Sequence, residues 1–215
     1  MPDPTHFALF FVAALLLAIT PGPGIFYVAA RTLAGGRTEG MASSFGTGLG
    51  GMVHVFAGAL GVSAIVLASA ELFTALKLIG AVYLVWLGIR TIQIARRDAA
   101  AALIQSEDIA PVGSRRAFRE GAIVEALNPK TAAFFLAFIP QFVDSSAGNV
   151  ALQFLLLGFV SVILNTLADI GVAFASSRIR QGAAARPNLV RRLREGSGAA
   201  MVALGIGLAF AKCPA

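Results

Sequence analysis

The chain has 215 residues, of which 57% are hydrophobic and only 13% are charged. A soluble domain carries about 25% charged residues, and the apolar residues here form long runs that leave no polar face for water. These features exclude a soluble globular protein and predict an all-α integral membrane protein. The net charge of +6 comes from short segments between the apolar runs, which is typical of topology signals and argues against nucleic acid as a partner.

The first apolar run begins at Phe7 and continues past Pro21 to Ala30. No Lys or Arg precedes it, and it is longer than the hydrophobic region of a signal peptide. We therefore expect a retained first membrane span. The single cysteine, Cys213, has no partner for an internal disulfide and no metal-ligand spacing around it, so we expect an inert apolar residue, no metal site and no cofactor.

Six segments are long and apolar enough to cross a bilayer, which takes about 20 residues each. These segments lie at 7–30, 41–69, 72–95, 121–143, 147–176 and 197–213. The chain, 1–215, is then a single membrane domain. The polar stretch 96–120 is expected to be a cytoplasmic linker between two halves, 1–95 and 121–215, with three spans each.

Positive charge is distributed unevenly between the two sides of this arrangement. Fourteen of the 17 Lys and Arg fall on one side, namely Arg31, Arg37, Arg90, Arg96, Arg97, Arg115, Arg116, Arg119, Arg178, Arg180, Arg186, Arg191, Arg192 and Arg194. Lys77 and Lys212 fall on the other side, and Lys130 lies inside a span. Because basic loops stay in the cytoplasm, the sequence predicts a multi-pass protein of the bacterial inner membrane with both termini outside, in the periplasm.

Proline interrupts the first span of each half. The breaks consist of Pro21, Gly22 and Pro23 in the first span and Asn128, Pro129 and Lys130 in the fourth. Both lie roughly 12–15 Å from the cytoplasmic face at about 1.5 Å per residue. Because three spans precede the second half, the halves have opposite orientations, and paired breaks indicate a transporter made of two inverted three-helix repeats. A simple kink at each proline is the alternative.

A broken helix in a membrane offers backbone groups to a solute. The amides at the start of a half-helix suit a carboxylate, whereas freed carbonyls suit an ammonium group or a cation. An amino acid carries both a carboxylate and an ammonium group. The residues of the two breaks are therefore our first candidates for binding an amino-acid-like substrate.

Polar groups elsewhere in the spans extend the candidate site. A charged side chain within a span is costly and is a functional candidate by default. Glu125, Asn165 and Asp169 join the substrate-binding candidates, and Glu125 and Asp169 are also candidates for proton coupling. Lys130 can hold a substrate carboxylate, and the alternative is an ion pair with Glu125 or Asp169 that ties helices together.

The second span contributes a histidine and a glycine-rich motif. His54 is a third proton-coupling candidate, and a hydrogen-bonded packing histidine is the alternative. Gly46 and Gly50 are four residues apart and give a small-residue face that suits close helix packing. We favour packing over a role of these glycines in the path of the solute.

Taken together, these motifs resemble the LysE/RhtB family of amino-acid exporters. The resemblance rests on Pro21-Gly22-Pro23, on LNPKTAAFFLAFIPQF at 127–142 and on LKLIGAVYLVWLG at 76–88, and it covers nearly the whole chain. It implies six spans and proton-driven export, as antiport, of an amino acid or a close derivative such as threonine, homoserine, leucine, lysine or arginine.

The resemblance is closer to the homoserine/threonine branch, because the lysine/arginine branch carries an acidic residue in the second span. The second span of this chain, 41–69, contains glycine, methionine and His54 but no Asp or Glu. Glu125 departs from the pattern of the homoserine/threonine branch, which usually has a neutral residue at that position. An extra carboxylate favours a cationic or amine-rich substrate.

Three other functions compete with amino-acid export. An exporter of a metal cation or another small metabolite would have the same fold, and transport of the test solute discriminates between them. A membrane enzyme needs a nucleophile with a base, or clustered metal ligands, and a passive membrane subunit leaves the paired breaks unexplained. We expect that the protein is not an enzyme. Its expected partners are a small-molecule substrate, protons and the lipid bilayer, and a homodimer is an open alternative.

Overall fold

The computed structural model describes residues 4–68, 110–144 and 148–182, with isolated positions between 75 and 93 and between 195 and 206. The regular structure of these described residues is helical, as the all-α prediction requires. The predicted spans at 72–95 and 197–213 and most of the predicted linker lie outside them. The six-span count and the inverted repeats therefore stay predictions.

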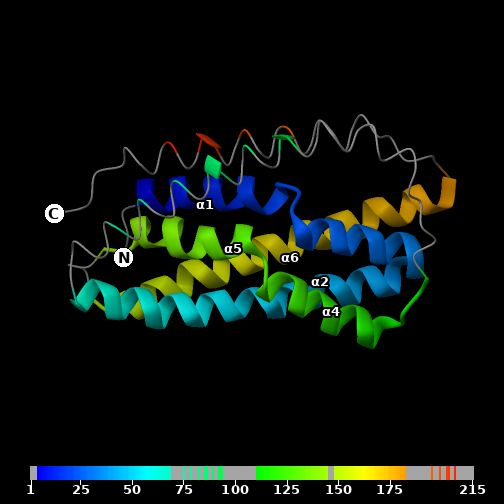
Figure 1. The fold of residues 1–215 in the computed structure, drawn as a ribbon, viewed down its shortest axis with the longest axis horizontal. Helices are drawn as coiled ribbons and strands as arrows, with labels where there is room; N and C mark the ends of the chain where they lie inside the picture. The colour runs from blue at the N-terminus through cyan, green and yellow to red at the C-terminus, as the bar shows by residue number, and fades with distance from the viewer. Residues whose placement is uncertain are drawn as a thin grey trace.

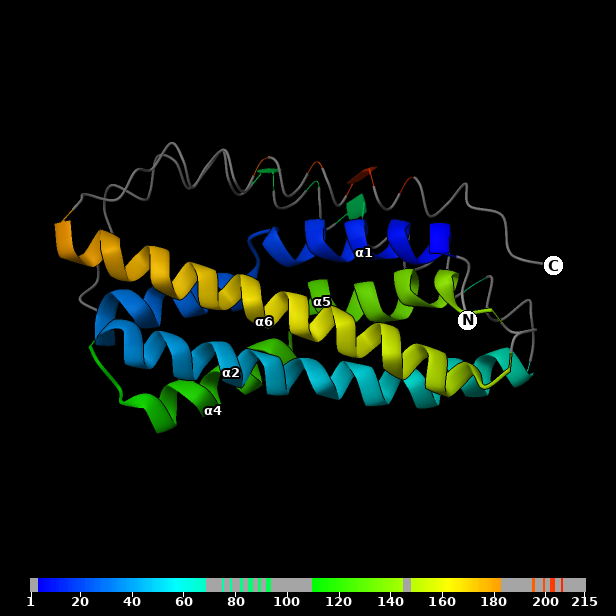
Figure 2. The ribbon, with the colours of Figure 1, turned by 180° about the vertical axis from the view of Figure 1, so that it is seen from behind.

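The described helices run side by side along the long axis of the molecule (Figures 1 and 2). They are α1 (Pro4–Ile19), α2 (Pro23–Ala68), α4 (Ser114–Ala126), α5 (Pro129–Ala133) and α6 (Val150–Gly182), with a π-helical turn η1 (Phe134–Phe138) and a 3₁₀ turn η2 (Ile139–Phe142) after α5. α2 packs along both α4 and α6. The helix α4 begins inside the stretch that the sequence assigned to the linker.

Up to three of the described helical segments meet the length and composition of a membrane span. α6 does so alone, over Val150–Arg178. The other two are bent pairs: Phe7–Ile19 with Pro23–Gly61, bent by 45°, and Ser114–Ala126 with Pro129–Phe142, bent by 43°. Helices of this length and apolar character fit a membrane protein.

α2 reverses direction at Gly36, where φ is 77° and ψ is −170° (Figure 1). A positive φ strains any residue with a side chain, so glycine suits this position. The turn lies where the sequence predicted the connection between the first two spans. It separates residues 23–35, which continue α1 beyond its break, from the long remainder of α2.

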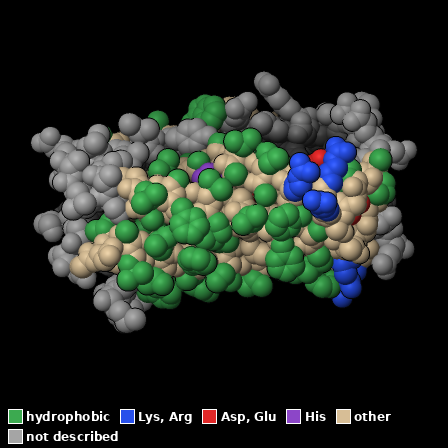
Figure 3. Space-filling view, turned by 90° about the horizontal axis from the view of Figure 1, so that it is seen from below, with side chains coloured by type: hydrophobic (Ala, Val, Ile, Leu, Met, Phe, Trp, Pro, Cys, Tyr) green, Lys and Arg blue, Asp and Glu red, His purple; other side chains and the backbone are tan. Residues whose placement is uncertain are grey.

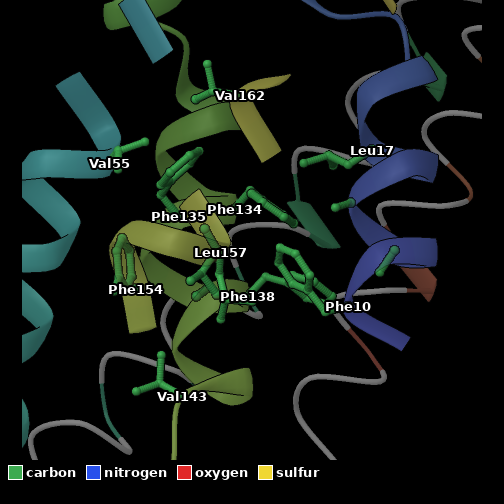
Figure 4. Packing of buried hydrophobic residues seen from close by; sticks show 14 of the residues in the cluster. Phe10, Leu17, Val55, Phe134, Phe135, Phe138, Val143, Phe154, Leu157 and Val162 are labelled. Atoms are coloured by element: carbon green, nitrogen blue, oxygen red, sulfur yellow. The ribbon is translucent and has the colours of Figure 1, made fainter. Parts of the chain in front are cut away.

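The buried core joins α1, α2, α6 and the segment from α5 to η2 (Figure 4). Its largest members are aromatic, and the rings of Phe134 and Phe138 stack with centroids 4.9 Å apart. Phe10 of α1 reaches this group through Phe142, at 5.4 Å between centroids. The aromatic packing fixes the irregular segment after α5 against α1 and thereby holds the two bent pairs together.

Hydrophobic side chains also cover much of the outside of the described helices (Figure 3). On α2, for example, Leu49, Phe56 and Leu60 are exposed. In water such a surface is unfavourable, whereas lipid accepts it. The basic side chains gather at one end (Figure 3), the same end at which α2 reverses direction, α4 starts and α6 ends (Figure 1).

Glycines allow α2 and α4 to approach very closely. A Cβ added at Gly46 would collide with the carbonyl oxygen of Phe118, and one at Gly50 with that of Ala122. A Cβ at Gly121 of α4 would lie 2.8 Å from the carbonyl oxygen of Ser43. The packing interpretation is therefore confirmed for Gly46 and Gly50.

A buried carboxylate that the sequence analysis did not single out binds the segment before α4 to α2 at the basic end of the molecule. Glu39 of α2 is 4% exposed, and its Oε1 accepts hydrogen bonds from the backbone N–H groups of Val112 and Gly113 at 2.9 and 2.7 Å. These amides lead into α4, whose N-cap residue has no side-chain cap of its own. Arg31 lies 4.0 Å from the other oxygen of this carboxylate.

We expect Glu39→Gln to lower the melting temperature of the purified protein by about 2–4 °C, because the neutral amide oxygen is a weaker acceptor for the two N–H groups. Thermal unfolding in detergent measures the shift. Thr38→Ser, at an exposed neighbouring position, serves as the control and should unfold at the wild-type temperature. An unchanged melting temperature for Glu39→Gln would show that the charge of this carboxylate does not stabilise the connection.

Candidate functional site

Both helix breaks predicted from proline are present. α1 ends at Ile19 and α2 begins at Pro23, and α4 ends at Ala126 and α5 begins at Pro129. The bends, 45° and 43°, are nearly equal. Proline at the start of a helix is favourable because its ring fixes φ and the N–H it lacks has no partner there.

The backbone compensates for the loss of a donor in the same way at both breaks. Pro21 removes the amide that a continuous helix would direct at the carbonyl of Leu17, four residues earlier, and Pro129 does so for the carbonyl of Glu125. The N–H one residue before each proline donates instead: Thr20 to Leu17 O at 3.1 Å and Asn128 to Glu125 O at 3.0 Å. The two breaks therefore share their local geometry as well as their bend.

The side chain of Glu125 is held at the second break. It is 5% exposed, and its Oε2 accepts from Asn128 Nδ2 at 2.9 Å while its Oε1 accepts from Thr131 Oγ1 at 2.6 Å. Asn128 also caps α5, because its Oδ1 accepts from the backbone N–H of Lys130 at 3.0 Å. These bonds fix the carboxylate relative to the start of α5.

Asp169 of α6 is buried next to the glycine-rich motif of α2. Its Oδ2 lies 2.6 Å from Thr47 Oγ1, and the same hydroxyl lies 2.8 Å from the carbonyl oxygen of Ser44. A threonine hydroxyl has a single proton to donate. Thr47 therefore contacts two oxygens but can donate to only one of them at a time.

A small cavity brings the two carboxylates together. It is lined by Thr47, Gly48, Gly51, Glu125, Thr131, Phe135, Val162, Asn165 and Asp169. The cavity has a volume of about 10 Å³, which is close to the minimum that holds one water molecule. It is too small for an amino acid. The described residues around it are thus in a closed arrangement.

The cavity unites only part of the predicted site. Glu125, Asn165 and Asp169 line it, and the sequence did not single out Thr47 or Thr131, which also do. The other predicted residues do not line it, namely Pro21, Gly22, Pro23, Asn128, Pro129, Lys130 and His54. The first break nevertheless adjoins the site, because a Cβ at Gly24 would lie 2.5 Å from Glu125 Oε2.

Lys130 is 4% exposed and reaches into the first break. Its Nζ donates to the carbonyl oxygens of Thr20 at 2.9 Å and Leu17 at 3.3 Å. Gly22 leaves the space for this side chain, since a Cβ there would be 3.2 Å from Lys130 Cδ. The hydrogen bonds of this ammonium group go to the end of α1 and not to either carboxylate of the ion-pair alternative.

His54 contacts the second break from α2. Its Nε2 lies 2.9 Å from the carbonyl oxygen of Glu125, and because a carbonyl only accepts, Nε2 carries the proton. The imidazole lies against the ring of Phe135, with 5.9 Å between centroids. This geometry corresponds to the hydrogen-bonded packing alternative, and the role in proton coupling stays a prediction.

Comparison with known proteins finds relatives along almost the whole chain. An uncharacterized membrane protein of Pseudomonas aeruginosa is 30% identical over 212 residues, which is 96% of each chain. A homoserine/homoserine lactone efflux protein of Salmonella typhimurium is 29% identical over 94% of this chain and 95% of its own. A leucine efflux protein of Enterobacter sp. is 29% identical over 83% of this chain and 80% of its own.

No solved structure matches the chain. Residues 15–212 match the family model described as LysE type translocator. This range begins in α1, just before the first break, and includes α2, α4, α5 and α6 with the carboxylate-lined cavity. The protein belongs to the LysE-type translocator family.

Proposed function

We propose that the protein exports an amino acid or an amino-acid derivative from the cytoplasm across the bacterial inner membrane, in exchange for protons. The observation that carries this proposal is the pair of buried carboxylates, Glu125 and Asp169, at one cavity beside two helix breaks. Family membership and the relatives named for homoserine and leucine efflux support it.

Glu125 is the residue we assign to the ammonium group of the substrate. Asn128 donates a hydrogen bond to its Oε2 and Thr131 donates one to its Oε1, which fixes the carboxyl group beside the cavity. A carboxylate has about four acceptor positions, so two remain for an ammonium group. Its position on the cavity makes those acceptors available to a solute when the cavity widens.

Asp169 is the residue we assign to the proton. When its carboxylate is ionised, Thr47 donates to it; when it is protonated, the acid donates to Thr47 Oγ1 and Thr47 donates to Ser44 O. A rotation of one hydroxyl therefore satisfies both protonation states without moving a helix. This property suits a group that takes up and releases a proton in each cycle.

The two breaks complete the substrate site in this proposal. The N-terminal ends of α2 at Pro23 and α5 at Pro129 carry a partial positive charge that attracts the substrate carboxylate. Pro21, Gly22, Asn128 and Lys130 shape these ends, and Asn165 contributes an amide to the cavity. Because the cavity is closed to an amino acid, transport requires it to open alternately to each side of the membrane.

The membrane arrangement is proposed with the function. Basic side chains at the end formed by the Gly36 turn, the start of α4 and the end of α6 mark the cytoplasmic side, which leaves both termini in the periplasm. Six spans in two inverted three-helix repeats are supported by the equal bends and the shared hydrogen bonding of the two breaks.

Efflux from intact cells tests the proposal. Cells that produce the protein are loaded with labelled homoserine, threonine, leucine, lysine or arginine, or with a metal cation, and compared with empty-vector cells. We expect at least one amino acid to leave several times faster, and the difference to vanish when a protonophore collapses the proton gradient. If only the metal cation leaves faster, or no solute of the panel does, the amino-acid proposal is wrong.

A further inference from the structure

Each helix break leaves a carbonyl that a side chain from a distant part of the sequence satisfies. Lys130, at the start of α5, donates to Leu17 O in the first break. His54, in the part of α2 that follows the reversal at Gly36, contacts Glu125 O in the second break. Both acceptors stand four residues before a proline of a break.

The carbonyls of Leu17 and Glu125 lack the backbone donor that a continuous helix would supply. A buried carbonyl without a partner in hydrocarbon costs several kcal/mol, and Pro21 and Pro129 remove the amides that would serve Leu17 and Glu125. Thr20 N and Asn128 N fill one acceptor position of each carbonyl. A carbonyl oxygen has a second lone pair, which Lys130 contacts at Leu17 O and His54 contacts at Glu125 O.

The side chains of Lys130 and His54 lie outside the cavity that Glu125 and Asp169 line. Neither residue lines the cavity, whereas both carboxylates do. Lys130 Nζ has a second acceptor in Thr20 O, at 2.9 Å. The imidazole of His54 is held on one side by Glu125 O and packed against Phe135. Both polar groups are thus engaged by backbone.

We infer that Lys130 and His54 are positioning residues that cap the carbonyls left open by proline, Lys130 that of Leu17 in the first break and His54 that of Glu125 in the second. Lys130 then ties the second break to the first, and His54 ties the second break to the part of α2 after Gly36. Glu125, whose backbone carbonyl is one of the capped groups, is thereby kept at the cavity. This inference rests on the proposed function only in that the breaks frame the transport site. It assigns neither residue to the substrate or the proton.

Double-mutant cycles in thermal unfolding test the capping directly and need no transported solute. We expect His54→Leu to lower the melting temperature by about 5 °C. Pro129→Ala restores an N–H that can donate to Glu125 O, so His54→Leu should cost much less in that background. In the Pro21→Ala background, the control, the cost should stay unchanged. Likewise, Lys130→Met should lower the melting temperature less in the Pro21→Ala background than in the wild type, and the Pro129→Ala background should leave its effect unchanged.

Export measurements separate positioning from proton transfer. His54→Gln keeps an N–H donor but cannot carry a proton, so we expect it to recover most of the export lost in His54→Leu and to keep the pH dependence of the wild type. A flat pH profile in both variants would make His54 a proton relay and overturn the inference.

If His54→Leu lowers the melting temperature equally in the wild type and in the Pro129→Ala background, the capping inference is also wrong. If no solute is exported by the wild type, the proposed function fails while the unfolding cycles still decide the capping. The two failures are therefore distinguishable.

Discussion

Asp169→Asn is expected to abolish export driven by a proton gradient while preserving exchange of substrate for substrate, and Glu125→Gln is expected to lower both on the order of 10- to 100-fold at substrate concentrations below saturation. The amide that replaces the carboxyl group of Asp169 can bond to Thr47 but cannot take up a proton, so only the coupling is lost. Glu125→Gln removes the charge that we assign to the ammonium contact. A hydrogen bond to a charged group contributes about 1.5–3 kcal/mol, which corresponds to a loss of affinity on the order of 10- to 100-fold.

Proteoliposomes measure both activities with one preparation. Uptake of labelled substrate is driven either by a pH difference or by unlabelled substrate on the opposite side. Glu120→Gln is the matched control, because Glu120 is on the same helix as Glu125 but its side chain is 33% exposed, and it should keep both activities. Loss of exchange in Asp169→Asn, or retention of it in Glu125→Gln, would contradict the division of roles.

The breaks could be predicted from the sequence because their cause is local. Proline lacks an amide wherever it occurs, so Pro21 and Pro129 indicate a disturbance without any knowledge of the fold. The hydrogen bond between Asn128 and Glu125 is equally local, since residues three apart share a helix face. Asn165 and Asp169, four residues apart, share a helix face for the same reason, and both line the cavity.

The partners of Lys130 and His54 could not be predicted, because they lie 113 and 71 positions away in the chain. The sequence suggests that a buried lysine pairs with a buried carboxylate, as charge alone would favour. In the structure, the carbonyls freed by the first break satisfy the ammonium group instead. The sequence predicted that freed carbonyls suit an ammonium group, but the group in place belongs to the protein itself.

Residues without a distinctive pattern were missed altogether. Thr47 and Thr131 are hydroxyls within apolar spans, which hydropathy tolerates and periodicity does not single out. Their importance depends on which carboxylate lies opposite, and that is set by how α2, α4 and α6 pack. Glu39 stands near a predicted loop, where a charged residue is ordinary; only the path of residues 112–113 over α2 makes it a buried acceptor.

Gly50→Ala is expected to separate α2 from α4 and to destabilise the protein by about 3 kcal/mol, or about 6–12 °C in melting temperature. The added methyl group would meet the backbone oxygen of Ala122 and would lie 2.9 Å from the backbone nitrogen of Ala126 and 3.0 Å from Glu125 Cβ. Backbone atoms cannot rotate away as a flexible side chain can. The helix α4 must therefore shift, and it takes the carboxylate of Glu125 away from the cavity.

Gly171→Ala is the matched control, because this glycine is in the helix α6 and a Cβ there would meet nothing within 4 Å. Alanine favours a helix over glycine by up to about 1 kcal/mol, so the control should unfold at or above the wild-type temperature. Thermal unfolding measures both variants, and substrate exchange in proteoliposomes should fall only in Gly50→Ala. If Gly50→Ala unfolds like the wild type, then α2 and α4 do not approach as closely as these contacts require. In that case the position of Glu125 at the cavity, which depends on that approach, is wrong as well.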